Sequence, residues 1–172
     1  MSRIKLETVT ALQEQIEENS KLMEDIVTDI ISQYSDSLDN YVYFIRRCLQ
    51  DGERQLTNDE LDDICMNLSI LIYYASYQCE YLGIKDDISK AIYKEIYHSK
   101  RAEIDKGTVA DKNSLAELQS QNEQLTAICY SRAYKTLKAK VESAQELLSS
   151  AKKILSRRMA EMELTRMGGS GK

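Results

Sequence analysis

The feature that most restricts the fold of this chain is the absence of proline from its 172 residues. Glycine is scarce as well: there are six glycines, and three of them stand in the last five positions. β-Sandwiches and barrels need frequent turns, and doubly wound α/β folds need glycine-rich phosphate loops. The sequence therefore predicts an all-α protein, a helical hairpin or bundle with one long C-terminal helix.

Apolar residues recur at spacings of three and four in the first half of the chain, which is the period of an amphipathic helix. We expect helix over 5–50, with a break at 34–37, because Ser and Asp favour caps over helix interiors. Thr57 and Glu60 have the spacing of a capping box and predict the start of a second helix. Its apolar stripe alternates steps of four and three, and Gly83 is expected to end it.

The second half of the chain continues this pattern. A third helix is expected over 86–106, with Gly107 ending it in the left-handed region. Thr108 is a suitable N-cap for a fourth and long helix over 109–166. The polar stretch 119–124 is the most favourable place for a bend in that helix.

Composition divides the chain into three parts. Residues 1–52 form an acidic helical segment, and 57–166 form a helical core that carries the long basic C-terminal helix. Residues 167–172 have the composition of a flexible tail or a cloning scar.

Nothing in the sequence predicts a membrane segment. No run approaches 18 apolar residues, and the N-terminal stretch turns acidic without an apolar signal core. The four cysteines form no CxxC pair, and each lies among apolar residues of helical spacing. We expect reduced, buried thiols in a cytoplasmic protein.

The net charge of −5 is unevenly distributed. Residues 1–89 carry a net charge of −11, whereas residues 124–172 carry +6. The basic end is suited to bind an anion such as nucleic acid, or to pair with the acidic half of a neighbouring subunit.

We recognise no catalytic or cofactor-binding motif in the sequence. The terminal GGSGK lacks the helix that follows a phosphate-binding loop. Glu95 and His98 have the ExxH spacing of a metal ligand pair, but this is the chain's single histidine and such sites need further ligands. We expect no enzyme, no cofactor and no metal.

The C-terminal helix is predicted to be basic and amphipathic. Its apolar side defines an expected oligomer interface of Leu137, Val141, Ala144, Leu148, Ala151 and Leu155. Cations on the opposite side, and others at its margins, are candidates to contact nucleic-acid phosphates: Arg132, Lys135, Lys153 and Arg157, with Lys138, Lys152 and Arg158 at the margins. A solvated face and a membrane surface are the alternatives for this set.

Eleven of the twelve aromatic residues are tyrosines. Tyr130 and Tyr134 stand at the start of the basic segment and are candidates to stack on unpaired bases. Four others are expected in the core or at a subunit interface: Tyr73, Tyr74, Tyr77 and Tyr81.

From about Leu61 to the tail, the chain resembles the recombination mediator proteins of tailed phages. The resemblance lies in the helix KAIYKEIYHSKRAEIDKG, in the restart Gly107-Thr-Val-Ala-Asp-Lys112, and in the C-terminal helix YKTLKAKVESAQELLSSAKKILSRRMAEME. It implies a helical, ring-like homo-oligomer that binds single-stranded DNA and loads a recombinase onto DNA coated by a single-strand binding protein. The acidic first 60 residues depart from the family's pattern, and either weaken the DNA-binding surface or add a protein-binding module.

The expected function is that of a non-enzymatic, single-stranded-DNA-binding recombination mediator. The alternative is a helical structural, assembly or inhibitor protein that binds only other proteins. Salt-dependent binding to unpaired DNA distinguishes the two.

Overall fold

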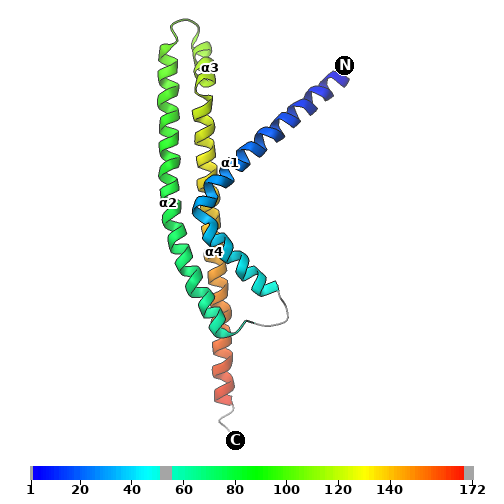
Figure 1. Ribbon diagram of the computed structural model, residues 1–172, viewed down its shortest axis with the longest axis vertical. Helices are drawn as coiled ribbons and strands as arrows, with labels where there is room; N and C mark the ends of the chain where they lie inside the picture. The colour runs from blue at the N-terminus through cyan, green and yellow to red at the C-terminus, as the bar shows by residue number, and fades with distance from the viewer. Residues whose placement is uncertain (1, 51–55, 169–172) are drawn as a thin grey trace. The chain divides into compact units, whose positions relative to one another are not determined.

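The structure is a computed structural model that describes the backbone of residues 2–50 and 56–168 and the side chains of 13–14, 16–50 and 56–167. Every element in these ranges is a helix, which confirms the all-α prediction (Figure 1). The helices are α1 (Ser2–Gln50), α2 (Asn58–Glu103), α3 (Val109–Gln119) and α4 (Gln121–Gly168).

The predicted break at 34–37 is wrong, because α1 continues through it. Ser35 is buried there, and its hydroxyl donates to Oδ2 of Asp39 at 2.6 Å. The ammonium group of Lys140, on α4, donates to both of these side chains. The polar groups expected to interrupt the helix are therefore satisfied by side chains without leaving helical geometry.

Gly83 does not end a helix, and the two helices predicted on either side of it are one helix, α2. A Cβ atom built on Gly83 would lie 3.1 Å from Cε2 of Tyr134, tighter than most real Cβ contacts. The glycine thus allows the ring of Tyr134, on α4, to approach the backbone of α2. This packing role replaces the predicted role as a helix stop.

The predicted helix starts are confirmed. The backbone N–H of Thr57 donates to the Glu60 carboxylate at 2.8 Å, and the N–H of Glu60 donates back to the Thr57 hydroxyl at 3.2 Å. Thr108 caps α3 through the same reciprocal pair with Asp111, and these hydrogen bonds lower the pKa of the Asp111 carboxyl. Gly107 has a positive φ of 116°, although α2 already ends at Glu103.

The helix predicted over 109–166 is divided at Ser120, inside the polar stretch where the sequence placed a bend. Ser120 is fully buried, and its N–H and hydroxyl both donate to the carbonyl of Ala116, at 3.0 and 2.8 Å. At the other end of α4, Met167 and Gly168 are helical rather than part of the predicted tail. The rest of that tail, 169–172, lies outside the described residues.

The chain forms two compact units, and the boundaries between them fall within α1, α2 and α4. Unit 1 comprises 1–33 and 81–135, and unit 2 comprises 34–80 and 136–172. The first boundary falls next to Tyr34, where the sequence predicted a break in the helix. Composition instead divided the chain between residues 52 and 57.

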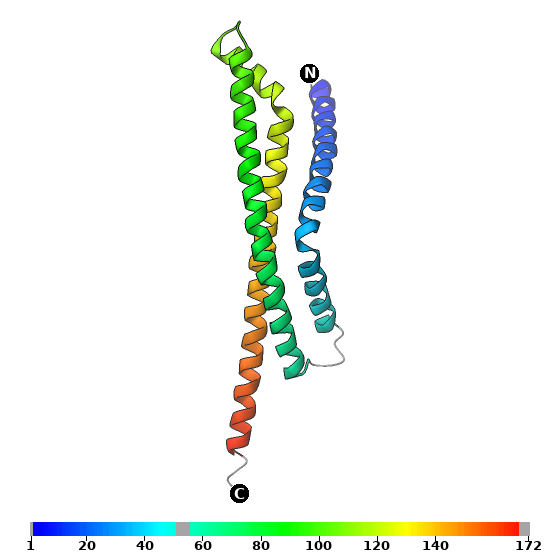
Figure 2. The same cartoon turned by 60° about the vertical axis from the view of Figure 1, so that its left-hand side comes forward.

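Unit 2 packs segments of α1, α2 and α4 around one core. Its buried apolar side chains are Leu38 and Ile45 of α1, Ile64, Leu68, Ile72 and Ala75 of α2, and Val141 and Ala144 of α4. The segments of α2 and α4 lie side by side and run in opposite directions (Figures 1 and 2). Each fully buried leucine of this kind contributes about 1.5–3 kcal/mol of hydrophobic transfer free energy.

Unit 1 pairs the second part of α2 with α3 and the beginning of α4 (Figure 2). Beside the fully buried Leu82, several of its buried positions carry small side chains: Ala116, Ala127, Cys129 and Ala133. Small side chains allow helix backbones to lie close together, as Gly83 does on the opposite helix.

The capping box of α2 gives a test of the helix start. Thr57→Ala should lower the free energy of unfolding by about 1 kcal/mol, because the N–H of Glu60 loses its hydrogen-bond acceptor. Urea denaturation measures this loss. An unchanged denaturation midpoint would show that the helix does not depend on this cap.

The contact between Gly83 and Tyr134 gives a second test. Gly83→Leu should destabilise the chain by about 1–3 kcal/mol, because the new side chain overlaps the tyrosine ring. In a Tyr134→Ala background the same substitution should cost clearly less, which a double-mutant cycle in urea measures. Additive effects in that cycle would contradict the close approach.

Candidate nucleic-acid interface

The cations predicted to bind phosphates lie along α4, and most of them are exposed. Arg132 and Lys135 belong to unit 1, where both side chains are exposed. The described residues provide no ion-pair partner for either of them. Both are therefore available to an external anion.

Unit 2 holds the larger group of cations. Lys138, Lys152 and Lys153 are exposed, and no described carboxylate forms an ion pair with them. Arg157 is exposed as well, and its Nε lies 3.7 Å from the Glu161 carboxylate. A surface pair at this distance is weak, so it leaves Arg157 able to exchange its partner for a phosphate.

Two basic residues of α4 are instead engaged within unit 2. Arg158 is half-buried, and its guanidinium donates to the backbone carbonyl of Leu56. Lys140 is half-buried and holds Asp39 and Ser35 of α1. Arg158 was predicted at the margin of the basic surface, but in the structure it ties α4 to the segment before α2.

The two tyrosines predicted to stack on bases are half-buried. The Tyr134 ring packs against Gly83, which gives it a structural role in unit 1. Tyr130 lies one turn earlier on α4 and lines a cavity. Base stacking by either ring stays a prediction.

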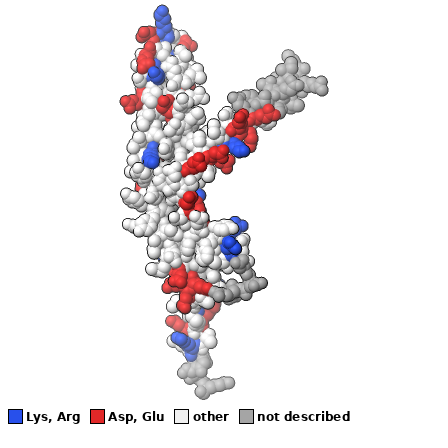
Figure 3. All heavy atoms as spheres, viewed as in Figure 1, with Lys and Arg blue, Asp and Glu red and all other residues white. Residues whose placement is uncertain are grey.

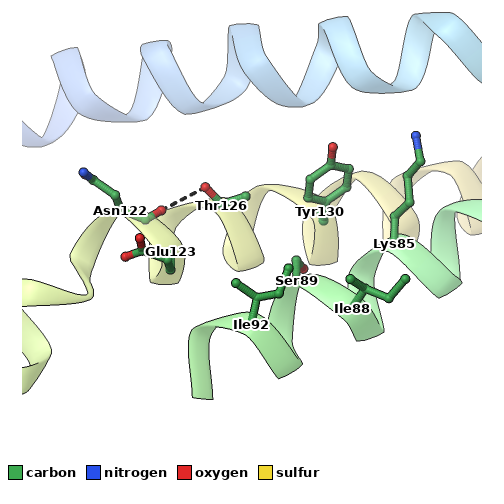
Figure 4. Close-up of a pocket in the computed structure, with 8 residues that line it drawn as sticks. All are labelled: Lys85, Ile88, Ser89, Ile92, Asn122, Glu123, Thr126 and Tyr130. Carbon is green, nitrogen blue, oxygen red and sulfur yellow. Dashed lines mark hydrogen bonds between the residues drawn. The ribbon is translucent and has the colours of Figure 1, made fainter. Parts of the chain in front are cut away.

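That cavity lies in unit 1 between α2 and α4 and has a volume of about 360 Å³. Figure 4 shows its lining, in which Thr126 donates to the carbonyl of Asn122 at 2.9 Å. Glu123 contributes a carboxylate oxygen that is buried and has no hydrogen-bond partner in the structure. The residues around it are Lys85, Ile88, Ser89 and Ile92 of α2 and Asn122, Glu123, Thr126 and Tyr130 of α4.

The apolar stripe predicted to form an oligomer interface packs within the chain instead. Four of its six members are buried, and Leu148 and Leu155 are half-buried. Val141 and Ala144 belong to the core of unit 2, and Leu148 packs against it. The spacing correctly marked a buried seam, but a helix of the same chain covers it.

Another set of apolar residues, on α2, is exposed, and the sequence reasoning missed it. Eight apolar residues of α2 are exposed at positions separated by three or four: Met66, Ile70, Tyr73, Tyr77, Tyr81, Ile84, Ile88 and Ile92. Three of the tyrosines expected in a core or interface belong to this set, and Tyr74 beside them is also exposed. The signal was present in the sequence as a second stripe on the same helix.

The cysteines are free thiols, of which Cys65, Cys79 and Cys129 are buried and Cys48 is half-buried. Burial raises the pKa of the three buried thiols, which suppresses the reactive thiolate. Among the described residues no three His, Cys, Asp or Glu side chains are grouped to hold a metal ion. Within those same ranges, no helix has an apolar stretch long enough to cross a membrane.

Comparisons with protein-family models, with curated proteins and with solved structures find no match for this chain.

Proposed function

We propose that this protein binds single-stranded nucleic acid through the cations of α4. The observation that carries the proposal is the exposure, in unit 2, of Lys138, Lys152, Lys153 and Arg157 on one helix. Lys153 and Arg157 are four positions apart, so they are neighbours on the helix surface. Repeated contacts of this kind give affinity for a phosphate backbone without reading its sequence.

The charge around these residues favours the same ligand. Between residues 132 and 158, α4 carries eight basic residues against two acidic ones, Glu142 and Glu146. Only Lys140 and Arg158 of the eight are held by hydrogen bonds to other helices or loops in the described residues. The remaining positive charge faces solvent and attracts a polyanion.

Within this proposal, the resemblance to phage recombination mediators supplies the biological setting. A mediator holds single-stranded DNA while a recombinase replaces the single-strand binding protein, and such a role needs no catalytic group. The protein partners on this reading are the recombinase and the single-strand binding protein. The alternative, a protein that binds only other proteins, is favoured by the exposed apolar face of α2.

The test changes Lys153 and Arg157 together to glutamine and measures binding to a fluorescent oligothymidylate by anisotropy over a range of salt concentrations. Each phosphate contact releases counterions from the nucleic acid, which makes the affinity depend on salt. The loss of two contacts should therefore reduce the slope of log affinity against log salt concentration by roughly 1.4. Affinity at low salt should fall as well.

The matched control changes Lys94 and Lys106 to glutamine, which removes the same charge from exposed positions outside α4. This variant should keep the slope of the unchanged protein. An equal loss in both variants would indicate a non-specific effect of net charge. No binding by the unchanged protein at low salt would reject nucleic-acid binding and favour the alternative.

A further inference from the structure

The cavity of unit 1 combines an apolar wall with a few polar atoms. On α2, Ile88 and Ile92 lie one turn apart and are 53% and 46% exposed, so a ligand in the cavity can reach both side chains. The ring of Tyr130, on α4, lines the same space (Figure 4). The volume of about 360 Å³ is within the range of small-molecule sites, which are mostly apolar and hold a small number of polar groups.

Three polar side chains of the lining can accept a hydrogen bond but have no proton left to donate. The hydroxyl of Ser89 donates to the carbonyl of Asp86 at 2.8 Å, and that of Thr126 donates to the carbonyl of Asn122 at 2.9 Å (Figure 4). Each hydroxyl proton is thus used within its own helix, and the oxygen keeps its capacity to accept. One carboxylate oxygen of Glu123 is buried, and no described group donates to it. A ligand suited to this cavity therefore brings hydrogen-bond donors.

Glu123 determines the charge of that ligand. A buried acceptor that has lost water and gained no donor is destabilising, and the penalty is larger for a charged group. A positively charged donor compensates it best, since charge-assisted hydrogen bonds are roughly twice as strong as neutral ones. Calcium and magnesium ions need several oxygen ligands, whereas the lining provides one carboxylate. An organic cation fits this site better than a metal ion does.

The places of the polar and apolar groups specify the shape of the cation. Glu123 lies at the end of the cavity near Ile92, and Lys85 lies at the opposite end, near Tyr130 (Figure 4). The ammonium group of Lys85 is 5.0 Å from the centre of the Tyr81 ring. From Glu123 to Tyr130 the cavity extends over about 10 Å along the axis of α4. This length accommodates a charged group at the glutamate and an apolar chain of several carbons.

We propose that this cavity binds a small primary amine in its ammonium form. The ammonium group has three N–H donors, and one of them bonds to the buried oxygen of Glu123. Thr126, three residues further on the same helix face, offers a second acceptor. The hydrocarbon chain packs against Ile88, Ile92 and the ring of Tyr130. The site belongs to unit 1 and does not depend on nucleic-acid binding, which rests on cations of unit 2.

Titration with two probes, followed by protein NMR at constant ionic strength, tests the site. The probes are n-hexylamine, which is protonated at neutral pH as a lysine side chain is, and the uncharged 1-hexanol of the same length. The protein should bind hexylammonium about tenfold more tightly than hexanol, because a hydrogen bond between charged groups contributes about that factor. No binding of hexylamine, or equal affinity for the two probes, would overturn the proposal.

Glu123→Gln removes the charge and keeps the size of the side chain. Its affinity for hexylammonium should fall about tenfold, while the affinity for hexanol should stay the same and show that the cavity is intact. The matched control is Glu117→Gln, which removes the same charge from an exposed position on α3 of the same unit. This variant should bind both probes as the unchanged protein does. An equal loss in the two variants would show non-specific attraction and overturn the proposal.

Ile92→Trp tests the apolar wall with Glu123 left in place. The larger ring should fill the space beside the glutamate and abolish the binding of both probes. Because Ile92 is partly exposed, the helix should tolerate the substitution, and circular dichroism checks this. Hexylammonium binding that Ile92→Trp leaves unaltered would place the ligand outside the cavity and contradict the assignment.

Discussion

The pairing of α2 with α4 is the interaction on which the rest of the structure depends. In unit 2, Leu68 and Ile72 of α2 share a core with Val141 and Ala144 of α4. Both stripes alternate steps of four and three, which is the repeat that keeps two supercoiled helices in contact along their length. The absence of proline lets each helix run for more than forty residues, so that repeated contacts of moderate strength add up along the seam.

The same pairing determines which surfaces are left for partners. Because α4 uses its apolar side within the chain, it presents Lys153 and Arg157 to solvent. The other side of α2, with Tyr73 and Tyr77, is left uncovered. Helix α4 thus offers positive charge without exposed tyrosines. Helix α2 offers exposed tyrosines, and its first half carries no positive charge. This separation is the physical reason why the nucleic acid is proposed to bind α4 rather than α2.

Local chemistry predicted the helix starts and the buried seam, because both are decided by a few neighbouring residues. Thr57 and Thr108 form their capping boxes as expected. Every residue of the apolar stripe predicted after Thr57 is buried: Leu61, Cys65, Leu68, Ile72, Ala75, Cys79 and Leu82. The errors arose where a distant residue decides the outcome. Gly83 stays helical and accommodates a ring from α4, and Ser35 stays helical with a lysine from α4 at its hydroxyl. Among the candidate site residues, Arg158 was misplaced for the same reason, since nothing in its own helix reveals the carbonyl of Leu56.

Leu68 and Ile70 lie two residues apart on α2 and test the central claim, that one side of this helix is covered within the chain and the other is not. Leu68 is 0% exposed and Ile70 is 50% exposed. The measurement is urea unfolding of Leu68→Ala and Ile70→Ala at a concentration low enough for single chains to predominate. Leu68→Ala should lower the free energy of unfolding by about 2–5 kcal/mol, and Ile70→Ala by no more than about 0.5 kcal/mol. Equal losses, or a larger loss for Ile70→Ala, would contradict the pairing of α2 with α4.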